Sequence, residues 1–180
     1  MLGDSLLIIM IAIIIVILGL LVWVISMYKK IIQGKVIVRT GAGGTKVFYN
    51  AGLVVPVLHK MEIMDISVKK LDVERTGVNG LICKDNIRAD IKVTFFIKIN
   101  KSTADVINVA QTIGCERASE VEVLRTLFDA KFSEALKTVG KKFEFIELYE
   151  ARSEFRAEII SIIGTYLNGY ILDDCAIDDL

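Results

Sequence analysis

The sequence predicts an α+β protein in which one membrane-spanning helix comes first, strands follow it, and helices follow the strands. Three observations support this order. No charged residue occurs between Leu6 and Met27, short β-branched runs then alternate with glycine and asparagine turns, and apolar residues later recur at helical spacing. We therefore expect an anchor over residues 1–30, a strand-rich subdomain over 31–100, and a helical subdomain with a short terminal strand over 101–180.

The anchor is expected to be an apolar helix over about residues 6–27. As a helix, its twenty-two residues would span about 33 Å, close to the roughly 30 Å of a bilayer's hydrocarbon core. Its sixteen leucine, isoleucine and valine residues favour insertion by about 5 to 10 kcal/mol in total. A cleaved signal peptide is the alternative, but it would require a basic start and a shorter apolar core. We expect a retained single-pass anchor.

Basic residues follow the anchor and none precedes it, which sets the expected orientation. Short flanking segments rich in lysine and arginine stay on the cytoplasmic side of a membrane. From Lys29 to Met61 there are six basic residues and no acidic one, whereas the last eight residues contain four aspartates. We expect the N-terminus outside and the C-terminal domain in the cytoplasm, where the three cysteines would be reduced thiols.

Residues near the end of the anchor have the chemistry of a membrane interface. Aromatic rings prefer the headgroup level, and lysine side chains can extend into it. Each basic residue near an anionic leaflet contributes about 1 kcal/mol, although an ordinary solvated segment explains these charges equally well. The later apolar run around Pro56 is either an edge strand, which we favour, or a loop that dips into the leaflet. The interface candidates are Trp23, Tyr28, Lys29, Lys30, Lys35, Arg39, Leu53, Val54 and Val55.

Strands are expected in the first half of the soluble part. Lys35–Thr40 and Thr45–Tyr49 are β-branched or aromatic runs on either side of Gly41–Gly44, which predicts a hairpin. Apolar residues alternate with polar ones within Ile63–Arg75. The alternation is clearest over Ile87–Ile99, which predicts a long antiparallel strand with one buried face.

Helices are expected in the second half. Ser102 is a candidate cap for a helix that Gly114 would end. Ser119 with Glu122 three residues later resembles a capping box, and the apolar stripe that follows continues to Gly140. A further helix is expected from about Ile146 to Asn168, and a last strand from Tyr170 to Leu180.

The motifs of catalysis and cofactor binding are incomplete in this chain. Gly41–Lys46 lacks the Gly-Lys-Ser/Thr ending of a phosphate-binding loop and the third glycine of a dinucleotide fingerprint. His59 is the only histidine, and no cysteine pair or carboxylate cluster accompanies it at metal-ligand spacing. No strand interleaves basic and aromatic residues as nucleic-acid readers do. We expect no enzyme activity, no cofactor, no metal and no nucleic acid; a membrane-anchored enzyme that uses His59 as its base is a distant alternative.

Four segments, taken in order and spacing, resemble the SPFH or band 7 superfamily, and within it the flotillin-like proteins of bacterial inner membranes. The similarity extends from about residue 30 to the C-terminus. It implies an α+β SPFH domain on the cytoplasmic leaflet of the inner membrane, self-assembly into rings or cages, and organisation of membrane microdomains. The segments are Val38–Gly44, Pro56–His59, Lys84–Asp90 and Ala110–Gly114.

The same resemblance implies partners and an alternative function. The implied partners are membrane lipids, further copies of the chain, and either an NfeD-type membrane protein or a membrane protease. Regulation of such a protease, as in stomatin-like and prohibitin-like relatives, is the alternative function. The family also carries a long coiled-coil region after the domain. No heptad pattern is sustained within these 180 residues, so we expect either the ordered part of a longer protein or a shortened relative.

Overall fold

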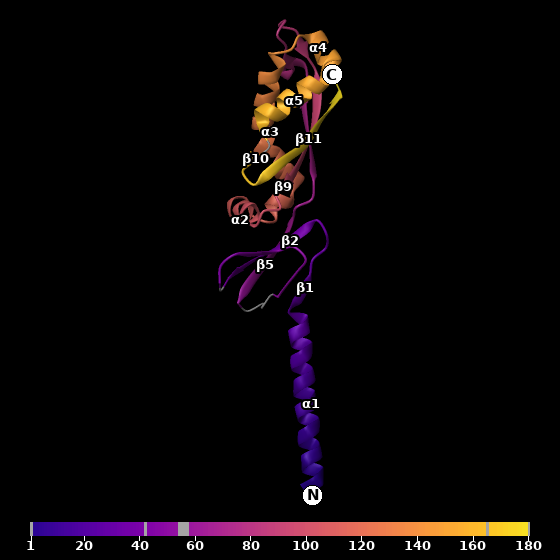
Figure 1. Cartoon of the computed structure of the whole chain (residues 1–180), viewed down its shortest axis with the longest axis vertical. Coiled ribbons are helices and arrows are strands. Elements are labelled where there is room, and N and C mark those ends of the chain that lie inside the picture. The colour runs from indigo at the N-terminus through magenta and orange to yellow at the C-terminus, as the bar shows by residue number, and fades with distance from the viewer. Residues whose placement is uncertain (1, 42, 54–57, 165, 180) are drawn as a thin grey trace.

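The structure is a computed structural model, and it describes residues 2–41, 43–53, 58–164 and 166–179. The chain is elongated, with one long helix at one end, a small strand unit in the middle, and a larger unit of sheet and helices at the other end (Figure 1). Helix α1, Leu2–Ser26, projects alone from the rest of the molecule. It contains most of the predicted anchor, because a run of apolar residues without proline gives no reason to break the helix.

The middle unit is built from two small sheets. β1 pairs antiparallel with β4, and a separate three-stranded sheet has the order β3-β2-β5. The predicted hairpin is confirmed, since Val38 pairs with Val47 across a turn in which Gly43 and Gly44 have positive φ. The strands are β1 Tyr28–Lys30, β2 Lys35–Gly41, β3 Lys46–Phe48, β4 Ala51–Leu53 and β5 His59–Asp65.

The three-stranded sheet separates the anchor side of the molecule from the larger unit. On one face, Val36, Val38 and Met64 are buried and belong to the core shared with the larger unit. On the other face, the Phe48 ring lies against Gly52 of the β1–β4 ribbon, where a Cβ would come within 2.9 Å of it. The two faces of this sheet therefore contact different parts of the molecule, one the larger unit and the other the β1–β4 ribbon.

The larger unit contains a four-stranded antiparallel sheet of order β10-β11-β9-β6, with the short hairpin β7–β8 beside it. β9 covers the predicted alternating strand Ile87–Ile99 only from Ile91 on, where its core-facing side chains are buried, whereas Arg88–Ala89 form the separate strand β8. Because β9 pairs with β11, hydrogen bonding joins the strand-rich and helical parts across residue 100. The strands are β6 Lys69–Arg75, β7 Leu81–Ile82, β8 Arg88–Ala89, β9 Ile91–Ile99, β10 Tyr166–Leu167 and β11 Tyr170–Asp179.

Helices α3 and α5 pack on this sheet and complete the core. Phe132 of α3 is fully buried and stacks on Phe95 of β9, with ring centroids 4.2 Å apart. The helices are α2 Thr103–Thr112, α3 Val121–Gly140, α4 Phe145–Glu150 and α5 Arg152–Ile163, with 3-10 turns η1 Gly77–Asn79 and η2 Arg117–Ser119.

The predicted capping box at Ser119 is wrong. The N-cap of α3 is Glu120, one residue later. The Ser119 hydroxyl instead donates to the Cys115 carbonyl at 2.7 Å and accepts the N–H of Asp65 at 3.0 Å. A reciprocal contact of the capping-box type occurs at α4, where the N–H of Glu144 donates to Glu147 at 2.8 Å. Ser119 is thus committed to a tertiary contact, which local spacing does not reveal.

The predicted helix from Ile146 to Asn168 is also wrong in its extent. Ala151 leaves helical geometry, with φ of −107° and ψ of 39°, and separates α4 from α5. Asn168 and Gly169 both have positive φ and form the turn between β10 and β11. An Asn-Gly pair serves a helix end or a two-residue hairpin equally well, so pairing with β11 decided between them.

Candidate membrane interface

Helix α1 has an apolar surface that nothing in the described chain covers. The segment Ile9–Ser26 is long and apolar enough to cross a membrane, and none of it is buried within the protein. A core helix of a soluble protein would be mostly buried, so this exposure favours a membrane environment. Trp23 and Tyr28, the aromatic candidates, are 61% and 54% exposed at the end where the chain enters the strand unit.

The pairing of β1 with β4 brings two interface segments together. Tyr28 lies opposite Leu53, so the start of the apolar run sits beside the end of the anchor. Lys29 and Lys30 are exposed in the same ribbon. Val54 and Val55 lie outside the described residues, as does Pro56. Twenty or more residues separate these two segments in the sequence. Only the strand pairing shows that they are neighbours.

Of the remaining two basic candidates, Lys35 begins β2 and Arg39 lies in its second half. The guanidinium of Arg39 lies over the Phe48 ring, 5.2 Å from its centroid, in a cation–π contact on the anchor-facing side of the sheet. Lys35 pairs with Asp65 at the other end of the strand, where the chain leaves the strand unit. The structure therefore places Lys35 at the junction of the two units, and Arg39 nearer the membrane side.

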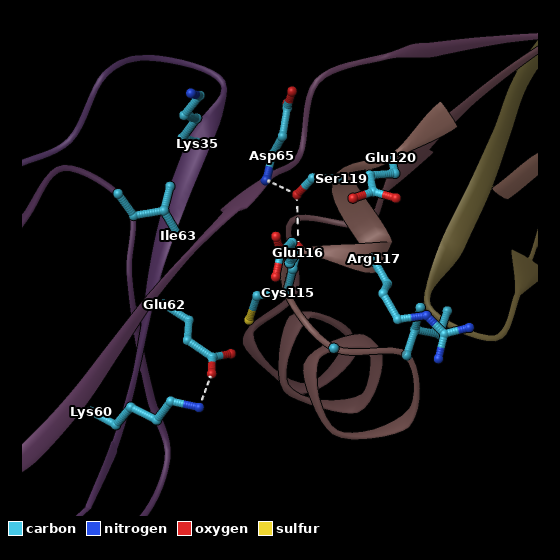
Figure 2. Close-up of a pocket in the computed structure, with 12 residues that line it drawn as sticks. Lys35, Lys60, Glu62, Ile63, Asp65, Cys115, Glu116, Arg117, Ser119 and Glu120 are labelled. Atoms are coloured by element: carbon cyan, nitrogen blue, oxygen red, sulfur yellow. Dashed lines mark hydrogen bonds and ion pairs between the residues drawn. The ribbon is translucent and has the colours of Figure 1, made fainter. Parts of the chain in front are cut away.

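The junction between the units contains a cavity of about 880 Å³ on the β5 side of the sheet. Figure 2 shows the side chains of Lys60 and Glu62 extending from β5 toward the loop that carries Cys115. Lys60 and Glu62 form an ion pair at 2.5 Å, and this contact lowers the pKa of Glu62. The cavity lining is thus polar and carries charges of both signs, with Lys60 and Glu62 paired to each other and Asp65 paired to Lys69.

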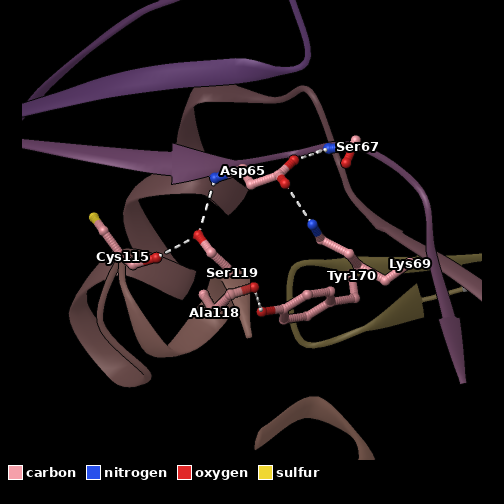
Figure 3. A network of polar contacts seen from close by, with 7 residues as sticks. All are labelled: Asp65, Ser67, Lys69, Cys115, Ala118, Ser119 and Tyr170. Carbon is pink, nitrogen blue, oxygen red and sulfur yellow. Dashed lines mark hydrogen bonds and ion pairs between the residues drawn. The ribbon is translucent and has the colours of Figure 1, made fainter. Parts of the chain in front are cut away.

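Hydrogen bonds at both edges of the three-stranded sheet join the two units. The Asp65 N–H donates to Ser119, and the Asp65 carboxylate accepts from Lys69 and from the N–H of Ser67 (Figure 3). At the opposite edge of the sheet, the Tyr49 hydroxyl donates to the carbonyl of Lys101 at 2.8 Å. Sequence reasoning missed these residues, because the partners are 52 or 54 positions apart and no short motif marks them.

The catalytic alternative rested on His59, which is half-buried at the start of β5, opposite Gly41. A Cβ at Gly41 would come within 2.3 Å of the Leu58 carbonyl, so the backbone here is closely packed. In the described ranges, no group of three or more histidine, cysteine or acidic side chains is arranged to hold a metal ion. The described geometry offers a membrane-facing surface and a polar junction.

The family model for the SPFH domain / Band 7 family matches residues 29–180, which is the whole chain after the anchor helix. The chain belongs to the SPFH domain / Band 7 family. It is 34% identical over 130 residues to the flotillin family inner membrane protein YqiK of Escherichia coli (strain K12), a match that covers 72% of this chain and 23% of that protein. It is 22% identical over 154 residues to a flotillin family inner membrane protein of Synechocystis, covering 82% of this chain and 23% of that protein.

These matches confirm the resemblance to SPFH and flotillin-like proteins, and the α+β architecture with an N-terminal apolar helix agrees with it. The chain spans just under a quarter of the length of the two curated relatives. Both relatives are named as inner membrane proteins. Together with the uncovered helix α1, this makes the chain a membrane-associated SPFH protein.

The three cysteines of this SPFH protein should resist thiol reagents. All three are buried, and burial raises the pKa of Cys115 to about 12 and that of Cys175 to about 11, with Cys83 shifted in the same direction. Since the thiolate is the reactive form, we expect no iodoacetamide labelling of the native protein near neutral pH and labelling of all three after unfolding in urea. Mass spectrometry of the labelled peptides measures this.

The same shifts predict how stability depends on pH. The thiols have a higher pKa in the folded state than their ordinary value of 9.0, so the folded state holds these protons more tightly. Their contribution is fully present below about pH 9 and is lost as the pH rises toward 11 and 12. Urea unfolding midpoints should therefore fall across this alkaline range, and prompt labelling of Cys115 in the native protein would contradict its burial.

Proposed function

We propose that this SPFH protein is a non-enzymatic membrane scaffold that self-assembles on the cytoplasmic leaflet and organises membrane microdomains. The main observation in support of this proposal is the pairing of Tyr28 in β1 with Leu53 in β4. Because β1 begins two residues after α1 ends and is immediately locked into a sheet, no flexible linker separates the anchor from the domain. The strand unit is consequently held at the headgroup level.

The distribution of charge supports this orientation. Lys29 and Lys30 are exposed in the ribbon next to the anchor, where each contributes about 1 kcal/mol with anionic lipids. The acidic C-terminal strand ends at the pole of the molecule opposite α1 (Figure 1). An anionic leaflet would attract the first end and repel the second. In this proposal the N-terminus is outside the bacterial inner membrane, and lipids and further copies of the chain are the partners.

Chemical cross-linking in native membranes tests the self-assembly. We expect a ladder of oligomers when the membrane-bound protein is treated with an amine-reactive cross-linker, because exposed lysines are frequent around the strand unit. The same membranes dissolved in hot detergent before cross-linking provide the control and should give monomer only. A protein that remains monomeric in the untreated membrane contradicts the scaffold proposal.

Protease protection tests the orientation separately. In spheroplasts, a tag at the C-terminus should resist added protease until the membrane is broken, whereas a tag before residue 1 should be digested at once. The reverse pattern would place the domain outside the cell and remove the cytoplasmic leaflet as its partner.

A further inference from the structure

β5 is an open edge of the three-stranded sheet. Among the described strands it pairs only with β2. The N–H of Asp65 donates to Ser119 and not to β2. Backbone groups alternate in direction along an antiparallel ladder, so the N–H and C=O groups of Met61 and Ile63 also point away from β2. The strand has seven residues without proline or glycine, which makes it a regular template for another strand.

Side chains also take up single backbone groups on outer strands of the larger sheet. The carbonyl of Asp72 in β6 accepts a hydrogen bond from Arg125 at 3.0 Å. The N–H of Cys175 in β11 donates to the carboxylate of its neighbour Asp174 at 2.8 Å. Such capping prevents unwanted strand pairing. On β5, Ser119 takes up the N–H at the Asp65 end, and Lys60, Glu62 and Ile63 of the same strand line the junction cavity.

The residues along β5 are complementary to themselves. The order Lys60, Met61, Glu62 reads basic, apolar, acidic in one direction and acidic, apolar, basic in the other. When two such strands run antiparallel about Met61, each Glu62 faces the Lys60 of the other copy, and each Ile63 faces the other His59. The half-exposed Ile63 would then be covered. Opposite charges directly across a strand pair are stabilising, and like charges are destabilising.

We propose that two copies of this chain pair through the outer edges of β5, antiparallel and centred on Met61, to form one continuous sheet. This inference rests on the proposed self-assembly, and it specifies the contact through which two copies first associate. A two-fold axis between antiparallel strands stands perpendicular to their sheet. One face of this sheet packs on the larger unit and the other on the β1–β4 ribbon next to the anchor, so the rotation keeps both α1 helices on the same side of the joined sheet.

A disulfide at the two-fold axis tests the contact. Directly paired Cα atoms lie about 5.5 Å apart in this register, within the roughly 4.4 to 6.8 Å that a disulfide requires. Met61→Cys in the full membrane-bound chain should therefore form a covalent dimer on mild oxidation, and the three buried native cysteines do not compete. Lys46→Cys on β3, at the opposite edge of the same sheet, is the matched control and should stay monomeric.

Charge-reversal variants distinguish this β5 contact from chance collisions between neighbouring copies in the membrane. Added to Met61→Cys, either Lys60→Glu or Glu62→Lys sets like charges across the axis twice and should reduce the dimer roughly tenfold. An equal mixture of the two differently tagged variants should restore the mixed dimer, since a β5 strand with two acidic side chains then faces one with two basic side chains. Both variants lack the internal Lys60–Glu62 ion pair, so recovery can come only from pairing between copies.

Three results would overturn the β5 contact: no dimer from Met61→Cys, single charge variants that dimerise as well as their parent, or a mixture that does not recover. If amine cross-linking still gives an oligomer ladder, only this contact is wrong and the scaffold stands. If the ladder is absent too, both proposals fail.

Discussion

Replacing Val16 and Leu20 together with arginine should release the protein from the membrane. Both positions lie near the middle of the exposed apolar segment Ile9–Ser26. Each arginine at the centre of a spanning helix costs about 3 kcal/mol, and each lost apolar residue removes about half a kcal/mol. The pair therefore costs about 7 kcal/mol, which is comparable with the whole insertion energy of the helix. Fractionation should show the variant moving from the membrane pellet to the soluble or degraded fraction.

The control for this experiment is Val78→Arg, which adds a charge at an 86% exposed position in the larger unit. It should remain in the membrane pellet at the level of the parent. Retention of the double-arginine variant in carbonate-washed membranes would show that the strand unit binds lipid strongly without the helix. The anchor would then not be the main attachment.

Replacing Phe132 with alanine should lower the free energy of unfolding by about 3 to 5 kcal/mol. The side chain is completely buried, stacks on Phe95, and contacts the ring of Phe128 with centroids 5.8 Å apart. Truncation removes apolar area and leaves a cavity between α3 and the sheet, where neighbouring rings cannot close it fully. Urea unfolding of the protein in nanodiscs, followed by far-UV circular dichroism, measures the change.

Leu127→Ala provides the matched control on the same helix. Leu127 belongs to the predicted apolar stripe of α3, yet it is 46% exposed, so we expect a loss of about 1 kcal/mol or less. Equal losses for the two variants would mean that Leu127 is covered in the assembled protein. That outcome would identify a further contact surface on α3.

Local patterns were sufficient for several elements. Gly43 and Gly44 form the predicted hairpin turn, and the strand through Phe95 follows the predicted period of two, because each depends on residues next to one another in the chain. Patterns failed where one residue had two possible roles. Ser119 could cap a helix or bind a strand, and Asn168–Gly169 could end a helix or turn a hairpin. Packing against distant partners decided both.

The membrane interface shows the same division. An uninterrupted apolar run determined by itself that α1 is a helix suited to a bilayer, since insertion energy is a sum over the residues of the segment. Family membership was likewise readable from short motifs in order. Only the tertiary structure shows that Leu53 lies beside Tyr28, that Lys35 lies at the junction of the two units, and that the outer edge of β5 is open. Those positions depend on which strands pair, and pairing joins residues too far apart in the chain for any local pattern to specify.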